Sequence, residues 1–251
     1  MRHDDAVTWD GESAHSLAAL LDLPRVELRT SVSSTMDLAH TLAVEGAPAG
    51  TLVLADEQTA GRGRGGKRWR SAPGAGIWMT ILDRPNDADA LGVLAIRLGL
   101  RAAPVLERHV DAPIRLKWPN DLLVDGRKLA GILVEARWRD GSIDWVAIGI
   151  GVNVRIDGDE PEGTAVRAGA RRLDVLAELV PVVRAAARAR GSLTEEELGR
   201  WRARDHAAGK RCRQPIAGRI RGVAADGALI VEQGGEMALA RSGSLVLEEE
   251  P

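Results

Sequence analysis

The sequence predicts an α+β protein in which a large mixed domain is followed by a small all-β module. Helical and strand patterns succeed each other irregularly over the first 206 residues and include strands paired across short turns. From about residue 207 the pattern changes to short strands separated by glycine turns, which is typical of a small barrel. A chain of 251 residues suits one large and one small domain, which we expect at 1–206 and 207–251.

The expected elements follow from apolar spacing and from cap and turn signals. A short helix at 13–23 ends at Pro24 and a strand at 26–29 follows it. Ser34 stands three residues before Asp37 and suits the cap of the next helix. Further strands are expected at 51–55, 77–82, 114–118, 122–124, 128–137 and 142–150, and further helices at 88–109, 172–190 and 194–205. A long loop, 56–76, separates two of the strands.

Composition excludes several classes of protein. The 34 basic and 36 acidic residues nearly cancel, so the chain as a whole lacks the basic excess of a nucleic-acid or membrane-surface protein. No apolar run reaches the ~18–20 residues of a membrane span, and the N-terminal residues lack a signal-peptide core. Cys212 is the single cysteine, which forbids an internal disulfide. We therefore expect a cytoplasmic globular protein.

The stretch GRGRGGKRW (61–69) has the most unusual composition. With Arg70 it places five cations within nine residues, on a backbone whose glycines allow a ligand to approach closely. Its glycines match a dinucleotide fingerprint and a near P-loop, but Arg68 stands where a P-loop needs Ser or Thr, and no helix is expected after it. We reject both templates. The loop is expected to be mobile alone and to order around a polyanion; a solvated basic loop or a nucleic-acid patch is the alternative.

Four other segments combine polar residues with the ends of expected elements. They are the Ser34 and Thr35 pair at a helix start, KWPND (117–121) at a strand end, GRKLAGILVE (126–135) leading into a strand, and GIGVN (149–153) at the end of a strand. Each alone has a simpler interpretation as a helix cap, a turn or a close packing of backbones. Their chemistry becomes informative only in combination.

In this order and spacing, the five segments resemble the bacterial biotin–protein ligases, the biotin–[acetyl-CoA-carboxylase] ligase family. The resemblance is strong over about residues 30–155 and weak over the C-terminal module. It implies the class II aminoacyl-tRNA synthetase-like fold of biotin and lipoate ligases, a mixed sheet flanked by helices, followed by an SH3-like β-barrel. It also implies a form without the N-terminal DNA-binding domain of some relatives, either monomer or homodimer, that contacts neither DNA nor membrane.

The resemblance further implies a two-step reaction. Family members condense biotin with ATP in the presence of Mg²⁺ to biotinyl-5′-adenylate, and then transfer biotin to one lysine of a biotin carboxyl carrier domain. Because two anions must be brought together and pyrophosphate must leave, the chemistry needs positive charge, which the basic loop and Lys128 would supply. No residue of the chain is implied as a metal ligand.

The implied site residues fall into three groups. Biotin contacts are implied for Ser34, Thr35, Met36, Gln58, Arg62, Gly63, Arg64, Lys128, Gly131 and Ile132. Nucleotide contacts are implied for Lys67, Trp69, Asn120 and Asn153, with Trp69 near the adenine. Arg64, Lys117, Asp121 and Lys128 would be catalytic. Asp121 would orient or deprotonate the acceptor lysine, whose amine is mostly charged at pH 7.

Three positions depart from the family pattern. Met36 stands where Asn is common, and Gly65 stands where a second arginine often follows GRGR. The C-terminal end is acidic where relatives often supply an arginine for ATP, and the sequence leaves open whether Arg241 replaces it.

Two other functions remain alternatives. A lipoate–protein ligase shares the fold and the adenylate chemistry, but its arginine- and glycine-rich signature differs. A nucleic-acid-binding module would use the basic loop, and it predicts a positive excess across the whole domain that a net charge of −2 does not provide.

Overall fold

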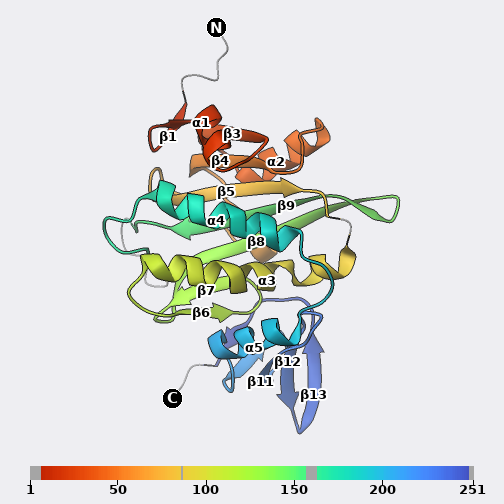
Figure 1. Ribbon diagram of the computed structural model, residues 1–251. Coiled ribbons are helices and arrows are strands. Elements are labelled where there is room, and N and C mark those ends of the chain that lie inside the picture. Colours follow the sequence, from red (N-terminus) through yellow and green to blue (C-terminus); the bar gives the residue numbers. More distant parts are fainter. Residues whose placement is uncertain (1–6, 86, 157–162, 249–251) are drawn as a thin grey trace.

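The computed structural model describes residues 7–85, 87–156 and 163–248. A seven-stranded sheet forms its centre, with strands in the order β3 (Arg25–Val32), β4 (Thr51–Gln58), β5 (Gly76–Asp83), β9 (Ser142–Asn153), β8 (Arg127–Arg139), β7 (Asp121–Val124) and β6 (Ile114–Lys117) (Figure 1). The β3–β4 pair is parallel and the other neighbouring pairs are antiparallel. The parallel pair requires a crossover, which α2 (Thr35–Val44) provides. The predicted mixed sheet is confirmed.

Helices cover both faces of this sheet. They are α1 (Ala14–Leu20), α2, α3 (Ala88–Leu106), α4 (Arg172–Ala187) and α5 (Glu195–Arg204) (Figure 1). Alternate strand residues face opposite sides. Leu52 and Leu54 accordingly belong to the larger core with α3 and α4, whereas Val53 belongs to a smaller core with α2. No helix in the described parts is long and apolar enough to cross a membrane.

The C-terminal module is a five-stranded antiparallel sheet. Its strands are β13 (Glu236–Ala240), β12 (Leu229–Gln233), β11 (Gly218–Val223), β10 (Arg211–Gln214) and β14 (Val246–Leu247), in that order across the sheet. Among the described strands β13 and β14 are the two edges, so the ladder is not closed by hydrogen bonds. The indole nitrogen of Trp118 donates to the carbonyl of Gly227 (2.9 Å), which joins this module to the KWPND segment.

Several boundaries differ from those predicted. The helix expected at 13–23 ends at Leu20, while β3 and β9 each run three residues past the expected ends of their strands. Strand length is set by pairing with neighbours, which apolar spacing does not reveal. Ser34 caps α2 as expected, but its hydroxyl accepts from the backbone nitrogen of Met36 (3.2 Å), two residues on, and not three. A short N-terminal pair, β1 (Thr8–Trp9) with β2 (Glu12–Ser13), was not predicted.

Glu107 connects the start of β6 to the end of α5. Its carboxylate accepts a hydrogen bond from Ile114 N (2.9 Å) and one from Arg204 (Nη2 to Oε2, 2.9 Å). The bond from Arg204 is the main reason that the pKa of Glu107 lies below its usual value, while burial acts in the opposite direction. The ionised carboxylate therefore stabilises the element that carries Lys117.

We expect Glu107→Gln to lower the free energy of unfolding by about 1–2 kcal/mol at neutral pH, because glutamine retains an acceptor for Ile114 but loses the charge. Since the folded-state pKa is depressed, this contribution is complete above the unfolded-state value of about 4.3 and is lost as pH falls through the folded-state value. Urea unfolding of both proteins across that range measures it. A difference that did not change with pH would show that the charge is not its source.

Candidate active site

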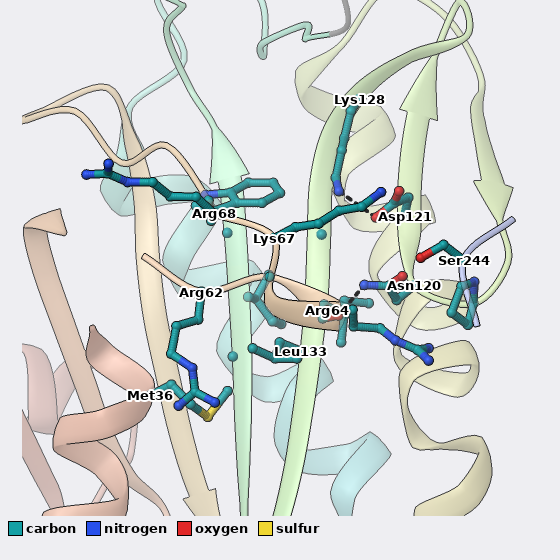
Figure 2. A pocket seen from close by; sticks show the side chains of 18 of the residues that line it. Met36, Arg62, Arg64, Lys67, Arg68, Asn120, Asp121, Lys128, Leu133 and Ser244 are labelled. Carbon is teal, nitrogen blue, oxygen red and sulfur yellow. Dashed lines mark hydrogen bonds and ion pairs between the residues drawn. The ribbon is translucent and has the colours of Figure 1, made fainter. Parts of the chain in front are cut away.

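A pocket lies where the loop after β4 passes over β8 and β9, beside the turn between β6 and β7 (Figure 2). Nearly all of the residues implied by the sequence line it. They are Ser34, Thr35, Met36, Gln58, Arg62, Gly63, Arg64, Lys67, Trp69, Lys117, Asn120, Asp121, Lys128, Gly131 and Ile132. Segments up to about a hundred residues apart in the chain thus form one site.

One end of the pocket carries uncharged hydrogen-bonding groups. Thr35 donates to Gln58 Oε1 through both its backbone nitrogen (2.8 Å) and its hydroxyl (3.0 Å). The hydroxyl of Thr80, in β5, donates to that of Thr35 (2.9 Å). Ser34 and Thr35 are buried. Because these side chains are held by one another and by the α2 cap, they present fixed polar atoms to a ligand.

Another part of the pocket is apolar. Met36 lies against Gly149, where an added Cβ would come within 2.8 Å of its terminal methyl carbon. Met79, Ile132 and Leu133 complete this section. Such a surface fits an aliphatic chain or ring, because these side chains need no hydrogen-bonding partner.

The other end of the pocket is cationic. Lys128 Nζ lies 2.7 Å from Asp121 Oδ1 and 4.9 Å from the centre of the Trp69 ring. Burial lowers the pKa of Arg64 from its usual value, and the nearby Asp121 carboxylate opposes this shift. Lys67 points toward the same region (Figure 2). The single carboxylate leaves this end positively charged, as binding of an anion requires.

Trp69 closes the cationic end from the side of the sheet. A Cβ added at Gly151 would lie 2.5 Å from the indole, and one at Gly131 would lie 2.8 Å from it. These two glycines therefore make room for the ring. Trp69 also meets Trp78 edge-on, at 6.4 Å between centroids. Its contact with adenine stays a prediction.

Two asparagines donate hydrogen bonds to backbone carbonyls of β8. Asn120 donates to the carbonyl of Ile132 (2.6 Å), which fixes the turn after β6 beside the pocket. Asn153 is the exception among the implied residues, because it does not line the pocket. It donates instead to the carbonyl of Lys128 (3.1 Å). Asn153 therefore fixes the backbone of Lys128. Its expected contact with the nucleotide stays a prediction.

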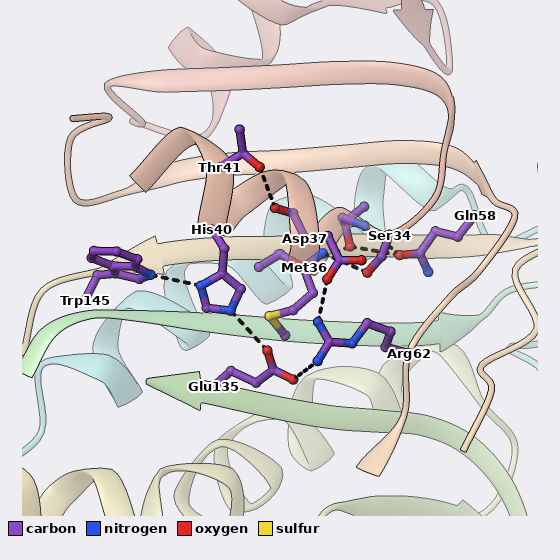
Figure 3. Close-up of polar contacts among 11 residues, drawn as sticks. Ser34, Met36, Asp37, His40, Thr41, Gln58, Arg62, Glu135 and Trp145 are labelled. Carbon is purple, nitrogen blue, oxygen red and sulfur yellow. Dashed lines mark hydrogen bonds and ion pairs between the residues drawn. The ribbon is translucent and has the colours of Figure 1, made fainter. Parts of the chain in front are cut away.

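The basic loop has partners within the protein, in contrast to the expectation that its cations would repel one another and await a ligand. Arg62 forms ion pairs with Asp37 and Glu135 (Figure 3). Arg68 donates to the carbonyl of Thr59 (2.5 Å). The loop backbone is bonded too, because Gly63 N donates to the carbonyl of Lys67 (2.7 Å). Local acceptors thus order part of the loop.

Several pocket residues were missed by the sequence reasoning. Thr80 was detectable as a lone polar residue in the apolar strand IWMTIL (77–82). Ser244 and its neighbours come from the C-terminal module, and no local signal indicated them (Figure 2). Arg241 pairs with Asp226 (3.0 Å) and does not line this pocket.

Among the described residues, no three His, Cys, Asp or Glu side chains are grouped so as to hold a metal ion. Asp121 is the acidic residue among those that line the pocket. Mg²⁺ in nucleotide sites is commonly held by phosphates and one or two carboxylates. The residues therefore fit an ion that arrives with a nucleotide and is held chiefly by its phosphates, and Asp121 would be the carboxylate within its reach.

Solved structures share this fold. The chain superimposes on the biotin protein ligase of Aquifex aeolicus, solved with biotin and ATP, with a TM-score of 0.74 over 91% of this chain and 100% of that one, at 24% identity. The fold is thus that of the biotin protein ligases. The sequence model of the biotin/lipoate A/B protein ligase family matches residues 28–153, and the chain belongs to this family.

Curated relatives are similar over different lengths. The bifunctional ligase/repressor BirA of Bacillus spizizenii is 41% identical over 136 residues, 51% of this chain and 40% of that protein. BirA of Escherichia coli is 34% identical over 205 residues, 74% and 63% respectively. The biotin–[acetyl-CoA-carboxylase] ligase of Mycobacterium tuberculosis is 29% identical over 78% and 79%. The chain thus spans less than two thirds of the two BirA proteins.

Proposed function

We propose that this protein is an ATP-dependent biotin–protein ligase that makes biotinyl-5′-AMP and transfers biotin to a lysine of a biotin carboxyl carrier domain. In this proposal residues 1–206 form the catalytic domain and residues 207–251 an SH3-like domain. The observation that carries it is the make-up of the pocket, which brings together uncharged hydrogen-bonding groups, apolar side chains and a cluster of cations. Biotin has the same order of groups: a ureido ring, an aliphatic chain and a carboxylate.

The first step needs charge more than proton transfer. The biotin carboxylate is ionised at neutral pH and attacks the α-phosphorus of ATP. A bond forms from the carboxyl oxygen to phosphorus, and the bond from that phosphorus to the bridging oxygen breaks, so pyrophosphate leaves. Arg64, Lys67 and Lys128 offset the negative charge that gathers there. Mg²⁺ carried by the phosphates would share this charge.

The second step needs a proton acceptor. The acceptor lysine enters as an ammonium group and gives up two protons as its nitrogen attacks the acyl carbon and AMP leaves with the carboxyl-derived bridging oxygen. Asp121 is the carboxylate at this end of the pocket and would take the first proton. The second passes to solvent. Because Asp121 contacts Lys128, the ammonium of Lys128 also orients it.

Biotin-dependent exchange of labelled pyrophosphate into ATP tests substrate and reaction together. We expect exchange with biotin, and at least ~10⁴-fold less with lipoate or octanoate, since neither offers a ureido group to the buried Thr35 and the partly buried Gln58. Exchange that lipoate supports equally would assign the protein to lipoate ligation. No exchange with either acid, together with tight, steeply salt-dependent binding of an oligonucleotide, would favour a nucleic-acid function.

A further inference from the structure

The two arginines that flank Gly63 point in different directions. Arg64 extends to the side of the pocket where Asn120 and Ser244 lie, whereas Arg62 extends away from them, toward Met36 (Figure 2). The resemblance implied biotin contacts for both. The structure therefore gives Arg62 a different set of neighbours, which are carboxylates of the protein itself.

Arg62 joins two elements on either side of the loop. One nitrogen of its guanidinium pairs with Asp37, in the first turn of α2, and the other pairs with Glu135 Oε1 (2.5 Å), in β8 (Figure 3). The planar guanidinium suits such a bridge, which the single ammonium of lysine would not reproduce. The start of the loop is thus tied to the helix that carries Ser34 and Thr35.

Glu135 is itself held in place. His40 Nε2 lies 3.0 Å from Glu135 Oε2, and the indole nitrogen of Trp145 donates to His40 Nδ1 (2.9 Å). An indole nitrogen can only donate, so Nδ1 is the acceptor and Nε2 of the neutral ring carries the hydrogen that faces Glu135. The network thus orients the carboxylate from α2 and β9 and leaves its second oxygen to Arg62.

This network is poorly placed to stabilise the whole fold. The side chains of Arg62 and Asp37 are 41% and 49% exposed, and exposed ion pairs contribute little to global stability. Its effect must therefore be local. The network holds the start of the basic loop. Further along, the same loop places Arg64 and Trp69 at the pocket.

We propose that Arg62 is the latch of the basic loop, and that Asp37 and Glu135, with His40 and Trp145 behind them, are positioning residues that hold the loop closed over the pocket. In this role the Arg62 side chain binds carboxylates of the protein and is not a ligand of biotin. The latch slows the release of bound biotin and of its adenylate, and this consequence rests on the proposed function. The closing of the loop itself does not.

Hydrogen exchange of the unliganded protein tests the latch without any ligand. The backbone nitrogen of Ala60 donates to the carbonyl of Ser33 (2.8 Å), outside the loop, so its exchange reports the release of the loop from the fold. We expect Asp37→Asn combined with Glu135→Gln to speed exchange in residues 60–69 about tenfold, with little change in the denaturant midpoint. Arg62→Lys should do the same. Unchanged exchange in these variants would overturn the latch.

Glu178→Gln is the matched control. Glu178 also lies between a histidine and an arginine, at 3.2 Å from His109 Nε2 and 2.9 Å from Arg108 Nη2, but it does not line the pocket. It should leave loop exchange unchanged. Equal acceleration in Glu178→Gln would show a general loss of rigidity and count against the latch.

The ligand arm uses the same variants with biotin and ATP. We expect the KM for biotin and the rate of adenylate release to rise about tenfold, while kcat for pyrophosphate exchange falls much less, because the charged groups of the reaction remain. Faster hydrogen exchange in the loop with an unchanged rate of adenylate release would overturn the proposal that Arg62 slows release of the ligands. If the wild-type protein shows no biotin-dependent exchange at all, the proposed function fails, and the hydrogen-exchange result still decides whether Arg62 holds the loop.

Discussion

Lys128→Ala should reduce biotin-dependent pyrophosphate exchange by about 10²–10³-fold, equivalent to about 2.7–4 kcal/mol of lost transition-state stabilisation. The ammonium lies at the cationic end of the pocket, over the Trp69 ring and 2.7 Å from Asp121. Negative charge gathers there as the biotin carboxylate meets the α-phosphate. A cation that is already in place in a partly buried site stabilises the transition state strongly, because it need not rearrange as the charge develops.

Binding of biotin alone should change far less in this variant. The hydrogen-bonding end of the pocket, around Thr35 and Gln58, does not depend on Lys128. Calorimetric titration with biotin in the absence of ATP measures this. Lys210→Ala, in the C-terminal module and away from the pocket, is the matched control. Near-normal pyrophosphate exchange by Lys128→Ala would show that Lys128 has no role in the mechanism, independently of the roles of the other residues.

The fold was largely predictable because its elements carry local signals. The hairpin between β8 and β9 has an aspartate–glycine turn, and α2 has a serine cap. Strand order has no such signal. The position of β5 beside β9 depends on pairing between residues about seventy positions apart, and spacing along the chain does not encode it.

The site was predictable to the extent that it is made of motifs. KWPND and GRKLAG lie on neighbouring strands, where their side chains meet in one pocket. The partners of Arg62 were not predictable, because Asp37, His40 and Glu135 come from a helix and a strand whose contact exists only in the folded chain. By sequence alone Arg62 counts among the cations available to a ligand, because no local signal reveals the two carboxylates that pair with it.

The GIGVN segment shows how a structural and a functional interpretation can both hold. Close packing of backbones was one interpretation of its glycines, and the structure confirms only that they are closely packed: a Cβ at either Gly149 or Gly151 would overlap a neighbour. Those neighbours are side chains of the pocket, however, and not backbone of another strand. The packing of β9 therefore decides where Met36 and Trp69 can lie.

Gly151→Ala should lower kcat for pyrophosphate exchange by about 10²-fold, because misplacing a catalytic surface by about 1 Å can cost that much. The new methyl group would lie 2.5 Å from Cε2 and 2.6 Å from Nε1 of Trp69. A rigid indole cannot yield at that edge without moving as a whole. Its movement would also displace Lys128, which lies over the same ring. Steady-state kinetics, with circular dichroism to check folding, measure the effect.

Gly149→Ala provides the comparison on the same strand, two residues away. Its methyl group would lie 2.8 Å from the terminal methyl carbon of Met36, and a flexible thioether can rotate out of the way where an indole cannot. We expect its kcat to fall less than about fivefold, with the larger change in the KM for biotin, since Met36 lines the apolar section. If both variants lost kcat equally, crowding of β9 in general would explain the result. A larger loss in Gly151→Ala would instead assign the effect to Trp69 and, through it, to Lys128.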